Sequence, residues 1–144
     1  MNQAWIFQYN PRYGFDLMEY LKQYDPNDAE TPTWSVNQHR KKIKKGDEVF
    51  FWKTQPDSGI YVIGRTLSDP FASHEPTRFG AIKCYVQFDY VLNKPILRKH
   101  LLTDPDFTHL SVLRNPKGTN FPVSPKEREI LWEFFKHVGI SSVF

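Results

Sequence analysis

The sequence predicts one strand-rich α+β domain over residues 1–144, with a helix near its C-terminal end. A chain of 144 residues has the length of one ordinary domain and can bury a core without disulfides. Aromatic residues make up 16% of the chain, and 11 prolines divide it into short pieces. This composition favours short elements joined by turns over a helical bundle. The sequence contains no internal repeat, linker or low-complexity segment that would divide it into domains.

Alternation predicts the first strand at residues 5–9, and the Asn10-Pro11 dipeptide forms a turn that ends it. Asp16 is placed to cap a helix, and Glu19, three residues later, suits a capping box. The apolar face of that helix would consist of Leu17, Met18, Leu21 and Tyr24. Residues 25–33 are polar, lack periodicity and predict a loop.

A short helix is predicted over residues 37–45, with Val36 and Ile43 turned inward and Gly46 at its end. Its basic side chains would point outward.

Residues 48–53 and 60–66 predict a hairpin closed by a loop that contains Asp57-Ser58-Gly59. In its first strand, Val49 and Phe51 would share one face, and Phe50 and Trp52 the other. One aromatic pair would then be free to line something other than the core.

Turn residues predict a loop over residues 68–80, followed by a strand over residues 81–90 that Pro95 stops. The inward face of this strand would consist of Ile82, Cys84, Val86 and Phe88. A short helix is predicted near residues 97–102, and a turn at residues 118–121 leads into extended chain.

The C-terminal helix has the strongest local signals. Ser124-Pro125-Lys126-Glu127 combines a cap, a proline at the first helical position and the glutamate of a capping box. Apolar residues then recur at helical spacing up to Gly139, which ends the helix. Trp5 and Trp132 are assigned to the core.

The positive charge of this chain is concentrated in one stretch. The net charge of +3 is too small to indicate nucleic acid by itself. Residues 39–45, HRKKIKK, hold five of the 19 Lys and Arg residues without one acid. Such a run is most often a solvated face, but Trp34 lies close by, and positive charge beside aromatic rings suits a nucleotide. The residues predicted to contact phosphates are Arg40, Lys41, Lys42, Lys44 and Arg65.

The single cysteine, Cys84, cannot form an internal disulfide and is predicted to be a buried thiol in a reducing compartment, the cytoplasm. A signal peptide and a long apolar segment are both absent, which predicts that the protein is neither secreted nor embedded in a membrane.

A reactive constellation is not evident in the sequence. The five histidines are scattered and lack metal-ligand spacing, and one cysteine cannot build a zinc cluster. Glycine-rich phosphate loops and deaminase signatures are also missing. We therefore predict no catalytic residue, metal or cofactor, although a catalytic pair of Asp47 and His39 stays open.

Four stretches in series resemble the EVE family, a member of the PUA-like group that also contains the YTH readers of methylated adenine. They are WIFQYNP at the start, WSVN with IKKGDEVFFW in the middle, SGIYVIGR after it, and GTNFPV near the end. The resemblance covers nearly the whole chain in the family's order.

This resemblance implies a small, PUA-like mixed β-barrel flanked by short helices, with an aromatic pocket for a modified base such as 5-methylcytosine. The pocket residues it implies are Trp34 and Trp52, with Asn10 and Ser35 as polar partners. Three alternatives stay open: a reader of modified single-stranded RNA, a protein-interaction module, and a small enzyme acting on nucleic acid. A separate effector protein could act on what is bound.

Three positions in turns also have a structural interpretation. Asn10 could simply cap a turn, and Gly118 and Asn120 are predicted to serve backbone geometry.

Overall fold

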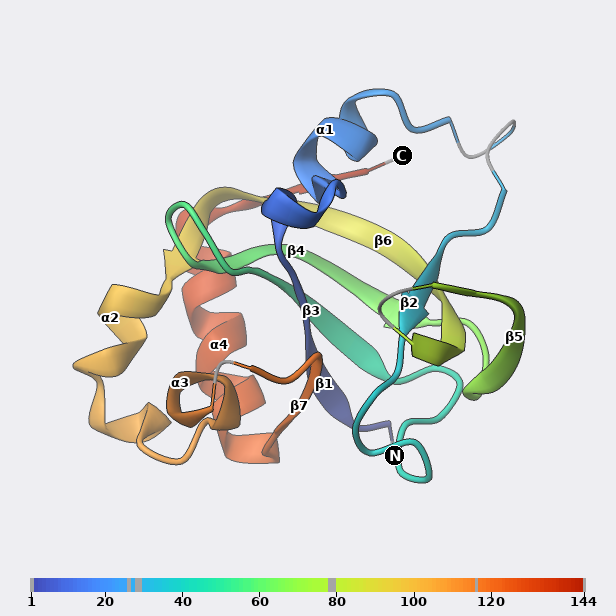
Figure 1. Cartoon of the computed structure of the whole chain (residues 1–144). Coiled ribbons are helices and arrows are strands. Elements are labelled where there is room, and N and C mark those ends of the chain that lie inside the picture. Colours follow the sequence, from blue (N-terminus) through green and yellow to red (C-terminus); the bar gives the residue numbers. More distant parts are fainter. Residues whose placement is uncertain (1, 26, 28–29, 78–79, 116, 144) are drawn as a thin grey trace.

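The computed structural model describes residues 2–25, 27, 30–77, 80–115 and 117–143. Within these residues, eight strands form one curled sheet, a half-barrel that short helices flank (Figure 1). The strands are β1 (Ala4–Tyr9), β2 (Thr33–Ser35), β3 (Glu48–Lys53), β4 (Gly59–Thr66), β5 (Phe71–Thr77), β6 (Gly80–Leu97), β7 (Asn120–Val123) and β8 (Ile140–Ser142). The helices are η1 (Pro11–Tyr13), α1 (Leu17–Lys22), α2 (Arg98–Leu102), η2 (Pro105–Phe107), α3 (Ser111–Arg114) and α4 (Pro125–Val138). The predicted α+β class is confirmed.

The sheet mixes parallel and antiparallel pairs in the order β2-β6-β4-β3-β1-β7. β1 runs parallel to β3, whereas β3, β4 and β6 follow one another as antiparallel neighbours. β5 and β8 pair with different parts of the long strand β6. The hairpin predicted from residues 48–66 is therefore present as β3 and β4.

Side-chain alternation gives this sheet a core on each face. Ile6, Phe50 and Trp52 belong to the core that also contains residues of α2, α3 and α4. Trp5, Phe7 and Phe51 belong to a second core with Trp34 and Phe88. Because successive residues of a strand point to opposite faces, both β1 and β3 contribute to both cores.

The face that includes Phe50 and Trp52 is therefore not free, contrary to the prediction. Phe50 is fully buried and Trp52 is 1% exposed. Phe50 packs edge to face on Phe135 of α4, at 5.1 Å between ring centroids. The helices at the C-terminal end of the chain cover this side of the sheet (Figure 1).

The predicted caps position both main helices. Asp16 accepts hydrogen bonds from the backbone of Met18 and Glu19 at the start of α1. Ser124 and Glu127 form the complete capping box of α4, and Gly139 ends this helix at a φ of 87°.

The helix predicted over residues 37–45 is absent, and these described residues form a loop with turns at residues 40–42 and 45–46. His39 has a φ of 58°, which is incompatible with a continuous right-handed helix. The turn after His39 closes where its carbonyl accepts from the N–H groups of Lys42 at 2.9 Å and Ile43 at 3.0 Å. Val36 and Ile43 are fully buried, as predicted.

Two strand boundaries also differ from the prediction. Residues 68–80 were expected to be a loop, but they contain β5, which pairs with β6. β6 also continues past Pro95 to Leu97. Its pairing with β4 is irregular between Val91 and Ile96, and a proline without an N–H is tolerated at such a bulge.

Among the described residues, none of the helices is both long enough and apolar enough to cross a membrane.

Candidate nucleic-acid interface

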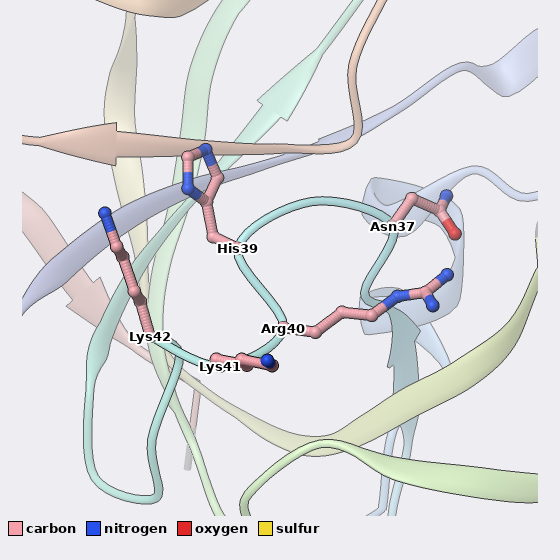
Figure 2. A pocket seen from close by; sticks show the side chains of 5 residues that line it. All are labelled: Asn37, His39, Arg40, Lys41 and Lys42. Atoms are coloured by element: carbon pink, nitrogen blue, oxygen red, sulfur yellow. The ribbon is translucent and has the colours of Figure 1, made fainter.

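Residues 37–45 form an exposed loop, which we call the basic loop. Together, Asn37, His39, Arg40, Lys41 and Lys42 line an open pocket of about 500 Å³. Figure 2 shows the His39 and Lys42 side chains on one side of the loop and Arg40 extending toward Asn37 on the other. The lining residues include three cations and no carboxylate. The pocket therefore suits an anionic ligand.

A reciprocal network fixes the start of the basic loop to residues 118–120. The Gln38 Oε1 atom accepts from the backbone N–H of Thr119 at 2.7 Å and of Asn120 at 3.0 Å. In return, Asn120 Oδ1 accepts from the backbone N–H of Asn37 at 2.8 Å and of Gln38 at 3.3 Å. The Asn120 amide also donates to the Ser35 carbonyl at 3.0 Å. Asn120 is only 1% exposed whereas Gln38 is exposed, so the network ties the surface loop to a buried side chain of β7.

Asp47 fixes the other end of the basic loop. This carboxylate is 2% exposed and accepts from the backbone N–H of Lys44 and from Trp5 Nε1, each at 2.9 Å. The loop is attached a second time through the Lys45 N–H, which donates to Asp69 at 2.8 Å. The loop is thus exposed at its side chains but braced at its backbone, which favours a preorganised contact surface.

His39 lies between an aromatic ring and a cation. Its ring is 5.3 Å from the Trp5 ring. Partial burial lowers the pKa of His39, and the positive charge of Lys42 lowers it further. At neutral pH the positive charge of the pocket therefore comes from Arg40, Lys41 and Lys42.

The remaining predicted phosphate contacts lie outside this pocket. Lys44 has an exposed side chain on the basic loop, although it does not line the pocket. Arg65 projects from β4 and pairs with Asp89 of β6 at 3.7 Å. The structure thus groups Arg40, Lys41 and Lys42 and leaves Arg65 in a local ion pair.

The two predicted base-binding tryptophans do not face one another in this structure. Trp34 belongs to the core with Phe51 and Phe88, whereas Trp52 belongs to the core on the helix side. Trp34 packs against Phe51, at 4.8 Å between ring centroids. Phe51 and Trp52 are neighbours on β3 and point to opposite faces of the sheet, so the two tryptophans lie on opposite faces. The sequence placed Trp52 on the Phe50 face of its strand but did not indicate that Trp34 would pack on the opposite face of the sheet, against Phe51.

The surroundings of Trp34 are aromatic and closely packed. Its ring is 7% exposed and meets the rings of Tyr9 and Phe15 edge to face at 6.0 and 5.6 Å. The Tyr9 hydroxyl is buried and has no hydrogen-bond partner among the described residues. Burial raises the pKa of Tyr9, and the negative charge of Asp16 raises it further.

Trp52 instead lines a pocket of about 270 Å³ at the ends of β1 and β3. The other lining residues are Gln8, Thr54, Ser58, Arg98 and Val112. The Thr54 hydroxyl is buried, and the part of the chain that the structure describes offers it no hydrogen-bond partner. Because a buried hydroxyl without a partner is costly, this atom is a candidate for contact with a ligand or a water molecule.

The predicted polar pocket residues have structural partners. Asn10 Oδ1 caps η1 by accepting from the Arg12 N–H at 3.0 Å, the role that the structural interpretation predicted. The Ser35 carbonyl is occupied by Asn120. Gly118 lies so close to the Phe121 ring and Gln38 that a Cβ atom would crowd both.

Sequence reasoning missed the residues that join the two pockets. Gln8 Nε2 donates to the Gly118 carbonyl at 2.9 Å, and the next two residues, Thr119 and Asn120, are bonded to Gln38. Residues 118–120 therefore lie between the basic loop and the Trp52 pocket. Only the GTN turn in the sequence pointed to this segment, and it gave no sign of its long-range partners.

Within the described residues, no three His, Cys, Asp or Glu side chains are grouped so that they could hold a metal ion.

Taken together, the fold and the surface define a small α+β half-barrel domain with a braced basic loop. The model of the EVE domain matches residues 3–134, and the chain belongs to the EVE domain family. A comparison with curated proteins finds no matching sequence.

Several solved structures share this fold at low sequence identity. A hypothetical protein from Leishmania major has a TM-score of 0.74 and 13% identity, with 95% of this chain and 96% of that chain covered. Rpa0253 from Rhodopseudomonas palustris has a TM-score of 0.73 and 12% identity, with 95% of each chain covered. Human THYN1, solved in complex with DNA containing 5-methylcytosine, has a TM-score of 0.68 and 14% identity, with 94% of this chain and 98% of that chain covered.

Proposed function

We propose that this protein binds nucleic acid that carries a modified base of the 5-methylcytosine type, without altering it chemically. The observation that carries the proposal is the basic loop, an exposed cationic pocket whose backbone is fixed at both ends. Membership of the EVE family and the fold shared with THYN1, which was solved with 5-methylcytosine DNA, support it.

Phosphate binding is assigned to the basic loop. Arg40, Lys41 and Lys42 can approach the phosphate backbone while the network of Gln38 and Asn120 keeps the loop in place. Each neutralised phosphate releases condensed counterions. The logarithm of the binding constant for a duplex should therefore fall linearly with the logarithm of the salt concentration, with a slope of about 0.9 per phosphate contact.

The base is assigned to the Trp52 pocket. In this proposal an extruded base enters the pocket beside Trp52, while Thr54 and Gln8 contact its polar edge. Because Trp52 is only 1% exposed, stacking on its ring requires the other lining side chains to move apart. Stacking on an aromatic ring contributes about 1–3 kcal/mol per base, and extrusion of a paired base costs a few kcal/mol. These terms nearly cancel, and the affinity for a duplex must therefore come from the basic loop.

We keep a second group of predicted base contacts, which consists of Trp34, Asn10 and Ser35. Contact with Trp34 requires that a neighbouring ring moves. Phe15 lies edge to face on Trp34, so a base would reach this indole only if the half-buried Phe15 moved. The Tyr9 hydroxyl would then become available to the same base.

Selectivity for a methyl group requires more than its burial. One buried methyl group contributes about 0.8 kcal/mol, roughly fourfold in affinity. A hydroxyl that is satisfied only by the correct base adds to this difference, because the wrong base leaves it unpaired. The Thr54 hydroxyl fits that role.

The test compares the binding of four labelled oligonucleotides by fluorescence anisotropy. Two are duplexes that differ only in one 5-methylcytosine, and two are single strands of DNA and RNA with the same sequence. We expect the methylated duplex to bind more tightly than the plain duplex and both to weaken as salt rises. Equal affinity for the two duplexes would refute recognition of the modified base, and binding that does not depend on salt would refute phosphate contact by the basic loop. A preference for the RNA strand would favour the single-strand alternative.

A further inference from the structure

The β5–β6 strand pair presents two aromatic rings on the outside of the half-barrel. The rings of Phe71 on β5 and Tyr85 on β6 are 4.9 Å apart and inclined by 32°. Tyr85 is 41% exposed, and Phe71 is half-buried. On β6 the neighbours of Tyr85, Cys84 and Val86, are fully buried, so Tyr85 points away from the barrel core. We call Phe71 and Tyr85 the ring pair.

The ring pair carries a cation beside it. Lys83 is two residues before Tyr85 and therefore projects from the same face of β6. It is also the direct partner of Phe71 in the register of β5 and β6. The described surface here thus combines flat apolar rings with a positive charge, as in sites that bind single-stranded nucleic acid.

Backbone contacts place the ring pair next to the basic loop. The Lys45 N–H at the end of that loop donates to Asp69, two residues before Phe71. The Tyr85 N–H donates to the Ser68 hydroxyl at 3.0 Å. Residues 68–69 are therefore bonded to the basic loop on one side and to the ring pair on the other.

A second connection runs through the start of β6. The Asn37 side chain, which lines the basic pocket, lies against Gly80, where a Cβ atom would collide with Asn37 Oδ1. Gly80 has a φ of 127° and begins the strand that carries Lys83 and Tyr85. The basic pocket and the ring pair thus border the same short stretch of chain.

We infer that the ring pair is a stacking platform for an unpaired nucleobase that lies next to the phosphates held by the basic loop. This inference rests on the proposed function and extends its surface. An unpaired base has a free face to offer to Tyr85, whereas the bases inside a blunt duplex are covered by their neighbours. Lys83 would contact the phosphate that adjoins the stacked base.

A simpler structural role makes a different prediction. A cross-strand aromatic pair can serve only to stabilise the sheet. Tyr85→Ala would then lower stability without selective loss of any ligand. Tyr85→Leu keeps an apolar contact with Phe71 but removes the flat ring, and it therefore separates stacking from packing.

The experiment measures affinity for an oligothymidine strand and for a blunt duplex by fluorescence anisotropy. We expect Tyr85→Leu and Tyr85→Ala to weaken binding of the single strand by roughly fivefold or more and to leave the duplex unchanged. Tyr85→Phe should behave as the parent does. The matched control is Tyr90→Ala, which removes another exposed tyrosine of β6, 37% exposed, and should change neither affinity.

Two results would overturn the inference: unchanged single-strand affinity in Tyr85→Leu, or equal losses for strand and duplex. A failure of the proposed function has a different signature. In that case charge reversal at Lys41 and Lys42 would have no effect on either ligand. Loss of binding on that reversal, with no effect at Tyr85, would reject only the stacking platform.

Discussion

Gln38 and Asn120 each satisfy the backbone of the other across 82 positions of the chain. The Gln38 side chain accepts from the Asn120 N–H at 3.0 Å, and the Asn120 side chain accepts from the Gln38 N–H at 3.3 Å. This exchange attaches an exposed, cationic loop to β7, a strand of the central sheet. The exposed loop is thereby given a defined backbone shape, which favours preorganised binding.

Asn120→Ala should lower both stability and nucleic-acid affinity. The change leaves the backbone N–H groups of Asn37 and Gln38 without their acceptor in a part-buried site, at a cost of about 1–3 kcal/mol. Urea unfolding measures the first effect and anisotropy the second. Asn115→Ala, at an exposed asparagine that ends α3, is the control. If Asn120→Ala bound duplexes as the parent does, bracing of the basic loop would not matter for binding.

Lys41→Glu combined with Lys42→Glu should weaken binding to every nucleic acid and flatten its dependence on salt. Both side chains line the open pocket, and their reversal adds repulsion as well as removing counterion release. Affinity measured over a salt series gives the slope. A control with charge reversal at the exposed Lys126 and Lys99 makes the same change in net charge away from the pocket. Equal losses in the two double variants would reduce the effect to net charge.

Thr54→Val should separate selectivity from stability. Valine has nearly the same shape as threonine and removes a buried hydroxyl that no described residue partners, so stability should stay the same or rise. The affinity for the methylated duplex should fall toward that of the plain duplex. Thr103→Val, at an exposed threonine outside both pockets, is the control. A parent-like preference for the methylated duplex in Thr54→Val would exclude Thr54 from base recognition.

Asp47→Asn should destabilise the fold without changing any pocket-lining residue. The carboxylate accepts from the Gln3 N–H, the Lys44 N–H and the Trp5 indole, and an amide offers only one oxygen to these donors. Hydrogen bonds to a charged group contribute about 1.5–3 kcal/mol each. We therefore expect a loss of roughly that size or more in urea unfolding. A variant as stable as the parent would show that the three donors find other acceptors.

Local signals predicted much of the fold because they depend on nearby residues alone. The capping box of Ser124 and Glu127 and the cap at Asp16 need only a few residues in sequence, and both are present. The loop at residues 37–45 shows the opposite case. Its composition suits a helix, but long-range bonds to Asn120 and Asp47 hold it in another shape, and His39 takes a positive φ.

The residue types of the candidate site could be predicted from the sequence, but their arrangement in space could not. The HRKKIKK run indicated positive charge, and three of its cations do line one pocket. Alternation predicts that Phe51 and Trp52 point to opposite faces of the sheet. It does not predict that a hydrophobic core covers each of these faces. The Trp52 pocket depends on Arg98 and Val112, which are distant in sequence and carry no local signature.

Alkaline conditions should reveal the burial of Cys84. Burial raises the pKa of this thiol from 9.0 to about 12. Below pH 9.0 the thiol is protonated in both states, and above it the unfolded chain ionises first, so stability is lost as pH rises. At pH 10.0, which equals the ordinary pKa of a tyrosine, the free energy of unfolding should be lower by about 1.4 kcal/mol than it is below pH 9.0. Urea unfolding of the parent and of Cys84→Ala between these pH values isolates the thiol, because the buried Tyr9 contributes equally to both proteins. The same pH dependence in the two proteins would mean that the thiol ionises as easily in the fold as in the unfolded chain.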